Sequence, residues 1–400
     1  MKPRVQNVSL WGEERLTLEQ SIALTIERLQ VHASPYKHWV VAFSGGKDST
    51  TVATFLMYLI ESGQIQAPER FTVVLADTGM EAPPLLFAAL ETLKTLAGRG
   101  VHTQVVRPAL DERFFVYMLG RGVPPPKNGF RWCTRLLKVK PMDIALAGVR
   151  EMSGEKMILL TGVREGESAA RDKRITIACS KENTECGQGY FQINPPDAVD
   201  DTLAPIIHWR VCHVWDWLTF FAPQYGFSTS VVAEVYGGDE AQETNARTGC
   251  IGCNLVNEDK MMARLLALPQ WSYLAPLKLL RPLYAELLEE RNRLRQDGTQ
   301  RLKDGSFPRN AMRMGPLTME ARRYALAHIK TLQEEVNALA EQQQRPKISL
   351  VSQEEEQRIL ELIEANTWPQ GWTGNEPRAD LNIPQAVTKD LYVLQNQLLA

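Results

Sequence analysis

The sequence has 400 residues, of which 44% are hydrophobic and 23% are charged, and its formal net charge at pH 7 is −2. This is the composition of an ordinary globular protein with two or three domains. The near-neutral charge excludes a generally basic nucleic-acid-binding chain, so any nucleic acid must contact a local patch. The N-terminus has no apolar signal core and no run reaches transmembrane length, and we therefore expect a cytoplasmic location.

A strand-to-helix turn with the sequence Ser-Gly-Gly-Lys-Asp-Ser occupies residues 44–49, which we call the phosphate loop. A short apolar run typical of a buried strand precedes it, and an apolar helical pattern begins at Thr50. Adjacent glycines let backbone N–H groups turn toward an anion, the helix dipole adds partial positive charge, and Lys47 adds a full charge. The turn therefore predicts phosphate binding, although its glycine spacing differs from that of a Walker loop. The predicted ligands are Ser44, Gly45, Gly46, Lys47, Asp48 and Ser49.

Further buried strands are predicted after the phosphate loop, at residues 71–76, 101–106 and 157–162. Strand–helix–strand units of this spacing form a parallel sheet with right-handed crossovers, and ligands bind beyond the carboxyl ends of its strands. Asp77 follows the first of these strands and should lie on the same rim as the phosphate loop. A helix N-cap is the alternative role for Asp77.

From about residue 256 the pattern becomes helical. We therefore divide the chain into a helical lead-in at 1–37, a phosphate-loop domain with the cysteines at 38–255 and a helical region at 256–400. Helices are expected in that last region at 265–280, 283–295, 318–339 and 348–365, and in the last dozen residues. The 318–339 helix has the clearest apolar periodicity.

Four of the six cysteines form two close pairs, Cys179 with Cys186 and Cys250 with Cys253. Few cysteines in a cytosolic chain argue against a disulfide framework and favour metal or redox use. Two sulfur pairs suit tetrahedral zinc or an iron–sulfur cluster, and the spacing does not decide between them. A lone CxxC is also compatible with a redox dithiol. Unrelated buried thiols are the remaining alternative, and Cys212 is expected to be one.

Two groups of basic residues stand out in the otherwise neutral chain. The first is Arg131, Arg135, Lys138 and Lys140, and the second is Arg171, Lys173 and Arg174. The first group could bind phosphate or form a solvated face. We favour phosphate or nucleic acid for the first group, because it adjoins Cys133. Three consecutive prolines at 124–126 forbid helix in the approach to it.

The Ser-Gly-Gly-Lys-Asp-Ser motif resembles the PP-loop of the ATP pyrophosphatases, the superfamily of PAPS reductases, ATP sulfurylases and tRNA thiolases. The resemblance implies a Rossmann-like (adenine nucleotide alpha hydrolase-like) α/β fold with a parallel sheet, and Mg²⁺-dependent cleavage of ATP between the α and β phosphates. Further segments resemble signatures of the PAPS-reductase branch, namely 77–81, 131–134, 162–171, and a final strand at 205–210 with a helix at 214–218. These imply ATP contacts from Asp77, Gly162, Arg164 and Arg171, with Arg164 facing the phosphates. The implied catalytic residues are Lys47, Asp48, Arg164 and Cys133.

The Gly-Cys-x-x-Cys element at 249–253 resembles the DndC/SspD family of bacterial DNA phosphorothioation systems, which carries a [4Fe–4S] cluster on four cysteines. The resemblance implies a cluster, with zinc as the alternative, on Cys179, Cys186, Cys250 and Cys253. It gives Cys133 the role of a replacement ligand or a sulfur carrier. The chain departs from the family pattern, which keeps its other cysteine pair shortly before the CxxC, whereas residues 231–248 contain no cysteine.

The same resemblance implies the partners: a cysteine desulfurase as sulfur donor, other phosphorothioation subunits, and DNA. DNA would be held by Arg131, Arg135, Lys138, Lys140 and Arg174. We therefore expect an enzyme that adenylylates a nucleic-acid backbone with ATP and then incorporates sulfur. The alternatives are a PAPS reductase, a tRNA thiolase, or a non-catalytic nucleotide-sensing subunit of a defence complex. The absence of a cysteine after Cys253 counts against the first. A homodimer is also open.

Overall fold

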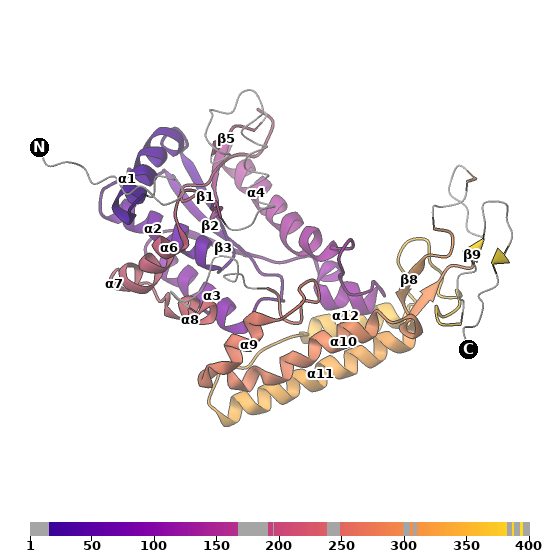
Figure 1. Ribbon diagram of the computed structural model, residues 1–400. Coiled ribbons are helices and arrows are strands. Elements are labelled where there is room, and N and C mark those ends of the chain that lie inside the picture. Colours follow the sequence, from indigo (N-terminus) through magenta and orange to yellow (C-terminus); the bar gives the residue numbers. More distant parts are fainter. Residues whose placement is uncertain are drawn as a thin grey trace, which may run out of the picture.

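The computed structural model describes residues 16–166, 191–194, 196–237, 249–298, 305–306 and 310–381, and the backbone at 386–387 and 393–394. At its centre lies a six-stranded sheet with the order β3-β2-β1-β4-β6-β5 (Figure 1). Its strands are β1 His38–Phe43, β2 Arg70–Ala76, β3 His102–Val106, β4 Met157–Leu160, β5 Phe191–Gln192 and β6 Asp200–Leu203. All neighbouring pairs are parallel except β5 with β6. The predicted Rossmann-like α/β fold is therefore confirmed.

Helices cover both faces of the sheet. The helices of the first part of the chain are α1 Leu18–Arg28, α2 Lys47–Glu61, α3 Pro83–Gly98, α4 Lys140–Ser153, α6 Val211–Asp216, α7 Ala222–Gln224 and α8 Ser230–Tyr236. Val41 and Ile158 belong to the large core cluster that also contains the buried residues of α2 and α3. Val40 and Val74 point to the other face and pack with Val149 of α4. Adjacent strand residues thus enter opposite cores, as the alternation of strand side chains requires.

Short π- and 3-10-helical segments join these elements. The π segments are η1 Leu29–Ala33, η3 Val116–Gly120, η4 Thr134–Val139 and η5 Trp217–Phe221, and the 3-10 segments are η2 Leu110–Glu112, η8 Pro269–Leu279 and η9 Glu290–Asn292. As predicted, the prolines at 124–126 lie in a segment without helix.

The C-terminal region is mainly helical, as predicted, and lies beside the carboxyl edge of the sheet (Figure 1). Its elements are α9 Lys260–Ala267, α10 Leu280–Leu287, α11 Met319–Gln342 and α12 Gln353–Glu364, with small strands β7 Arg293–Arg295 and β8 Met314–Leu317. Helix α11 is capped by the Thr318 hydroxyl and buries the predicted apolar stripe. The large core cluster runs from Leu29 to Ile363, so these helices share the core of the sheet. The three-part division of the chain stays a prediction.

Several predicted elements differ from the structure. The final strand expected at 205–210 is β6 at 200–203. Pro205 has no N–H to donate to a sheet ladder, and the apolar run after it is buried as a turn instead. The helix expected at 283–295 ends at Leu287, and residues 293–295 form β7. Helix α12 begins at Gln353 because Ser352 forms a capping box with Glu355.

Two further predictions are wrong. The last dozen residues were expected to be helical, whereas Val393 and Leu394 form strand β10, which pairs with β9 at Ala386–Val387. Cys212 was expected to be buried, whereas it is exposed. It lies on α6, where its neighbours His213 and Val214 occupy the buried face. None of the described helices is long and apolar enough to cross a lipid bilayer.

Candidate functional site

The phosphate loop follows β1 and leads into α2, whose N-cap is Gly46 in extended conformation. Gly45 has φ +68°, a left-handed conformation, and a Cβ there would lie 2.7 Å from the Cβ of Ala89. A side chain at this position is therefore excluded both by backbone strain and by contact with α3. The loop therefore leads tightly into the N-terminus of α2, the end of a helix that favours an anion, and phosphate binding there stays a prediction.

Two serine hydroxyls hold the loop in shape. The Ser49 hydroxyl lies 3.1 Å from the Gly46 carbonyl oxygen, to which it donates, and accepts from the Ser44 N–H at 3.2 Å. The Ser44 and Ser49 hydroxyl oxygens are 3.0 Å apart. These bonds fix the turn before any ligand arrives.

Asp48 lies between two cations. One of its carboxylate oxygens pairs with the Lys47 ammonium, and the other accepts a hydrogen bond of 2.6 Å from Nε of Arg164. Arg164 is fully buried, and its Nη1 also donates to the Trp209 carbonyl oxygen at 2.9 Å. The lysine of the loop and the arginine after β4 are thus joined through one carboxylate.

The glycine after β4 allows this contact. A Cβ at Gly162 would lie 2.8 Å from the Asp48 carbonyl carbon and 2.8 Å from the Ser49 nitrogen. The segment after β4 therefore packs directly on the backbone of the phosphate loop, which only glycine permits.

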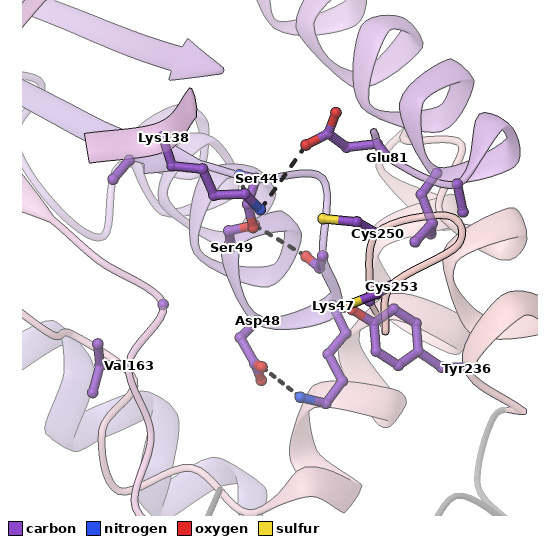
Figure 2. Close-up of a pocket in the computed structure, with 16 residues that line it drawn as sticks. Ser44, Lys47, Asp48, Ser49, Glu81, Lys138, Val163, Tyr236, Cys250 and Cys253 are labelled. Atoms are coloured by element: carbon purple, nitrogen blue, oxygen red, sulfur yellow. Dashed lines mark hydrogen bonds and ion pairs between the residues drawn. The ribbon is translucent and has the colours of Figure 1, made fainter. Parts of the chain in front are cut away.

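A cavity of about 510 Å³ brings the phosphate loop and the CxxC turn together (Figure 2). Its lining includes Ser44, Gly46, Lys47, Asp48, Ser49, Glu81, Lys138, Gly162, Tyr236, Cys250 and Cys253. In Figure 2 the Cys250 sulfur points toward the side of the cavity formed by Ser44 and Ser49. Arg164 is not among the described residues that line this cavity.

The CxxC turn is attached to the loop that follows β2. The Cys253 N–H donates to the Cys250 carbonyl oxygen at 3.2 Å, and the Ile251 N–H donates to the Met80 carbonyl oxygen at 2.8 Å. Gly252 has φ +66°, and a Cβ there would lie 2.7 Å from the Cβ of Leu280 on α10. The turn is therefore fixed between the rim of the sheet and the C-terminal helices.

The surroundings of Cys250 and Cys133 oppose the ionisation of these two thiols. Burial raises the pKa of the Cys250 thiol to about 11. Burial also raises the pKa of the Cys133 thiol, and the charge on Cys253 adds to the effect, so these two sulfurs are electrostatic neighbours. Cys179 and Cys186 lie outside the described residues. Within the described ranges, no group of three or more histidine, cysteine or acidic side chains is gathered closely enough to hold a metal ion.

A buried phenol stands behind the CxxC turn. Tyr284 is 1% exposed, and a Cβ at Gly252 would lie 2.9 Å from its Cε2 atom. Its hydroxyl has no hydrogen-bond partner among the residues that the structure describes. Burial raises its pKa, and the nearby Cys250 and Cys253 add to this effect. A buried hydroxyl normally has a partner, and sulfur bound at this turn would supply one.

Asp77 is buried on the rim of the sheet, but it does not cap a helix, because the N-cap of α3 is Ala82. Its carboxylate accepts hydrogen bonds from Nε of Arg107 at 2.7 Å and from the Gly79 N–H at 3.0 Å. Asp77 lines a second cavity of about 620 Å³, which shares Glu81 with the first. Its predicted contact with ATP stays a prediction.

The first basic group is exposed: Arg131 precedes η4, Arg135 and Lys138 belong to η4, and Lys140 begins α4. Lys138 lines the cavity, with its ammonium 3.9 Å from the Glu81 carboxylate. Lys140 pairs with Glu112, and Arg131 donates to Asn128. The structure therefore divides the group between the cavity and the neighbouring surface. The second group, Arg171, Lys173 and Arg174, lies outside the described residues.

Tyr236 is a site residue that the sequence analysis missed. It ends α8, lines the cavity, and its ring centre is 5.7 Å from the Lys47 ammonium, a cation–π contact. A Cβ at Gly46 would lie 3.0 Å from its hydroxyl oxygen. The contact joins segments far apart in the chain and no local pattern marks it, so only the folded chain reveals it.

The strand order, the glycine turn after the central strand β1 and the helix N-terminus that follows it define an α/β protein with a Rossmann-like architecture. Residues 38–221 match the sequence model of the phosphoadenosine phosphosulfate reductase domain. The match covers less than half of the chain and shows what this part of it is similar to.

Two solved structures are similar to the chain. One is a phosphoadenylyl-sulfate (PAPS) reductase from Candida auris in a phosphate complex, with 13% identity, 52% of this chain and 88% of that chain covered, and a TM-score of 0.33. The other is a mutant FMN adenylyltransferase from Candida glabrata, with 14% identity, 50% of this chain and 55% of that chain covered, and a TM-score of 0.30. These scores are too low to support an argument about function. No curated protein matches the chain.

Proposed function

We propose that the chain is an ATP pyrophosphatase that adenylylates a nucleic-acid backbone for sulfur incorporation, as in DNA phosphorothioate modification. The observation that carries the proposal is the shared cavity. Phosphate-binding groups and a pair of thiols line the same 510 Å³ space, so an activated phosphate and a sulfur donor can meet there. A nucleotide-binding protein without sulfur chemistry needs no thiols beside its phosphates.

The first step is nucleotidyl transfer. The phosphate loop binds the β and γ phosphates of ATP, together with Mg²⁺ and Lys47. A backbone oxygen of the acceptor attacks the α-phosphorus, the new O–P bond forms, and the bond from the α-phosphorus to the β-phosphate oxygen breaks. Pyrophosphate leaves with the electron pair. Positioning and stabilisation of the leaving charge supply the catalysis, as such transfers require.

The second step is sulfur transfer. Sulfur at the sulfide oxidation level attacks the activated backbone phosphorus, a P–S bond forms, and AMP leaves with the oxygen. A cysteine desulfurase partner supplies the sulfur as a persulfide, and a thiol reductant brings it to the sulfide level. Cys133, Cys250 and Cys253 are the described thiols near the cavity that can receive it.

A [4Fe–4S] cluster is part of the proposal, with zinc as the alternative. The residues that suit a sulfur-ligated group are Cys250, Cys253, the neighbouring Cys133 and Tyr284, whose hydroxyl has no partner within the described part of the chain. The described thiols alone do not complete a ligand set. Cys179 and Cys186 are the further candidate ligands. When bound, the cluster would be held by cysteine thiolates and would carry sulfur or electrons.

The DNA contact is proposed for the exposed basic residues beside the cavity, Arg131, Arg135, Lys138 and Lys140, with Arg174. Lys138 reaches the cavity, and the exposed Arg131, Arg135 and Lys140 lie within a few residues of it in the chain, whereas Arg174 lies outside the described residues. A strand held there by its phosphates would present a backbone oxygen to the nucleotide. A homodimer stays a prediction.

Pyrophosphate release from ATP tests the proposal. The wild type, given Mg²⁺, ATP and DNA, should release pyrophosphate and AMP. Lys47→Ala should lower the rate about 100-fold, because the leaving pyrophosphate loses a preorganised positive charge that stabilises it. Release of phosphate and ADP, or binding without any release, would contradict it. Arg150→Met is the matched control, since Arg150 bonds to the Ala198 carbonyl oxygen away from the cavity.

A PAPS reductase is the second candidate, because the domain match favours it. Such an enzyme binds a ready-made sulfonucleotide and needs no α–β cleavage. Sulfite release from PAPS with a thiol reductant, and no pyrophosphate from ATP, would identify it. The same preparation can be given both substrates, so one experiment separates the two candidates.

A further inference from the structure

Arg164 does not occupy the place that its predicted role requires. It was expected to face the nucleotide phosphates, yet it is 1% exposed and is not among the described residues that line the cavity. Its Nε bonds to the Asp48 carboxylate at 2.6 Å and its Nη1 to the Trp209 carbonyl oxygen at 2.9 Å. Both bonds hold the guanidinium behind the phosphate loop.

The segment that carries Arg164 is itself fixed. The Thr161 N–H donates to the Leu203 carbonyl oxygen at 2.9 Å, and the Glu165 N–H donates to the Ile207 carbonyl oxygen at 2.9 Å. Between these bonds, Gly162 packs on the Asp48 and Ser49 backbone. The segment is therefore a rigid support for the first turn of α2.

We propose that Arg164 is a positioning residue that acts on the phosphate through Asp48 and Lys47. Asp48 shares its negative charge between Arg164 and Lys47. Without Arg164, Asp48 keeps its ion pair with Lys47 but loses its ion pair with the arginine. The carboxylate then attracts Lys47 more strongly, and the lysine offers less positive charge to phosphate. Arg164 thus keeps the lysine of the loop available. The inference rests on the proposed function, because it assumes that a nucleotide phosphate is the ligand.

A mutant cycle separates this role from direct contact. The probe is α,β-methylene ATP with Mg²⁺, titrated calorimetrically into wild type, Arg164→Met, Asp48→Asn and the double variant. In the wild-type background, Arg164→Met should weaken binding about tenfold, the worth of a hydrogen bond between charged groups. In the Asp48→Asn background it should change binding by less than about twofold, because the carboxylate through which it acts is absent. An equal loss in both backgrounds would overturn the proposal.

Two further variants control for folding. Arg164→Lys can replace one of the two bonds and should give intermediate affinity. Arg150→Met removes an arginine that bonds to the carbonyl of Ala198 away from the cavity, and it should lower the melting temperature while leaving affinity unchanged. If Arg164→Met likewise lowered the melting temperature without changing the affinity of the folded protein, its role would be merely structural and the proposal would fail.

The same proteins distinguish this inference from the proposed function. A wild type that binds no α,β-methylene ATP would overturn the proposed function. The melting temperatures of the four cycle proteins would then decide whether Arg164 acts on Asp48. Shifts in the double variant that are smaller than the sum of the single shifts support the coupling, and additive shifts overturn it.

Discussion

At the scale of single residues, Cys250 shows how its surroundings set the chemistry of a thiol. Burial and the nearby Glu81 carboxylate oppose its ionisation, and the Lys138 ammonium favours it. The raised pKa keeps the free thiol protonated near pH 7. A bound metal displaces this proton, since a coordinating thiol is deprotonated outright. Whether the thiols carry such a group is therefore a decisive property of the site.

Anaerobic purification tests this property. We expect a brown protein with a broad band near ~400 nm and about four irons per chain, lost in Cys250→Ser because a ligand is removed. Cys212→Ser is the matched control, because Cys212 is exposed on α6, and it should keep the full iron content. A colourless protein with one zinc per chain would show that the site binds zinc and not an iron–sulfur cluster. A wild type without either metal would contradict both.

At the scale of elements, α1 is joined to the loop at 205–210 by a buried polar cluster. His208 accepts at Nδ1 from Nη1 of Arg28 and donates at Nε2 to the Ser21 carbonyl oxygen, both at 2.9 Å. These bonds require the neutral ring. Burial lowers the pKa of His208 to about 4. The hydrogen bond to the Ser21 backbone raises this pKa, whereas the charges of Arg28 and His213 lower it further. The contact between α1 and the domain should therefore depend on pH.

The sign follows from the lowered pKa. Below about pH 6.5 the unfolded histidine binds a proton that the folded one resists, so stability is full above that pH and is lost as pH falls toward 4. The free energy of unfolding, measured in urea, should decrease between about pH 7.5 and about pH 5. His208→Gln can keep both hydrogen bonds without titrating and should show a smaller decrease. An equal decrease in both proteins would contradict this assignment. His213, whose pKa burial also lowers, accounts for a remaining slope.

The elements also show what local sequence can predict. The strands around the phosphate loop and helix α11 were predicted within a few residues, because periodicity and caps are local signals. The apolar run at 205–210 was wrongly predicted to be a strand. An apolar run indicates burial, and both strands and packed turns can be buried. The link from Arg164 to Asp48 and the place of Tyr236 could not be predicted, since both join segments far apart in the chain.

At the scale of the whole molecule, Arg322 of α11 connects the C-terminal helices to the α/β part. Its guanidinium is buried and donates to the carbonyl oxygens of Leu119 at 2.6 Å, Thr367 at 3.0 Å and Gly120. It also lies 5.2 Å from the centre of the Trp368 ring. One side chain thus bonds two backbone segments, at residues 119–120 and at Thr367. Burial lowers its pKa to about 10, so it remains charged at pH 7.

Replacing Arg322 should separate these segments. Arg322→Met removes the donor from the buried carbonyl oxygens of Leu119 and Gly120 and from the partly buried one of Thr367, and it should lower the free energy of unfolding by about 3 kcal/mol. Arg323→Met on the exposed face of α11 is the control and should change it by less than about 0.5 kcal/mol. Urea unfolding measures both. Similar effects of the two substitutions would show that Arg322 does not connect the regions.

The bond from the Ile251 N–H to the Met80 carbonyl oxygen fixes the CxxC turn to the same rim as the phosphate loop. A group on the sulfurs and a nucleotide on the phosphate loop would therefore share one cavity. By thermodynamic linkage, whatever factor a group on the sulfurs imposes on nucleotide affinity, the nucleotide imposes the same factor on the affinity for that group. Measuring how ATP changes the affinity for a sulfur-bound group would therefore also give the effect of that group on the affinity for ATP.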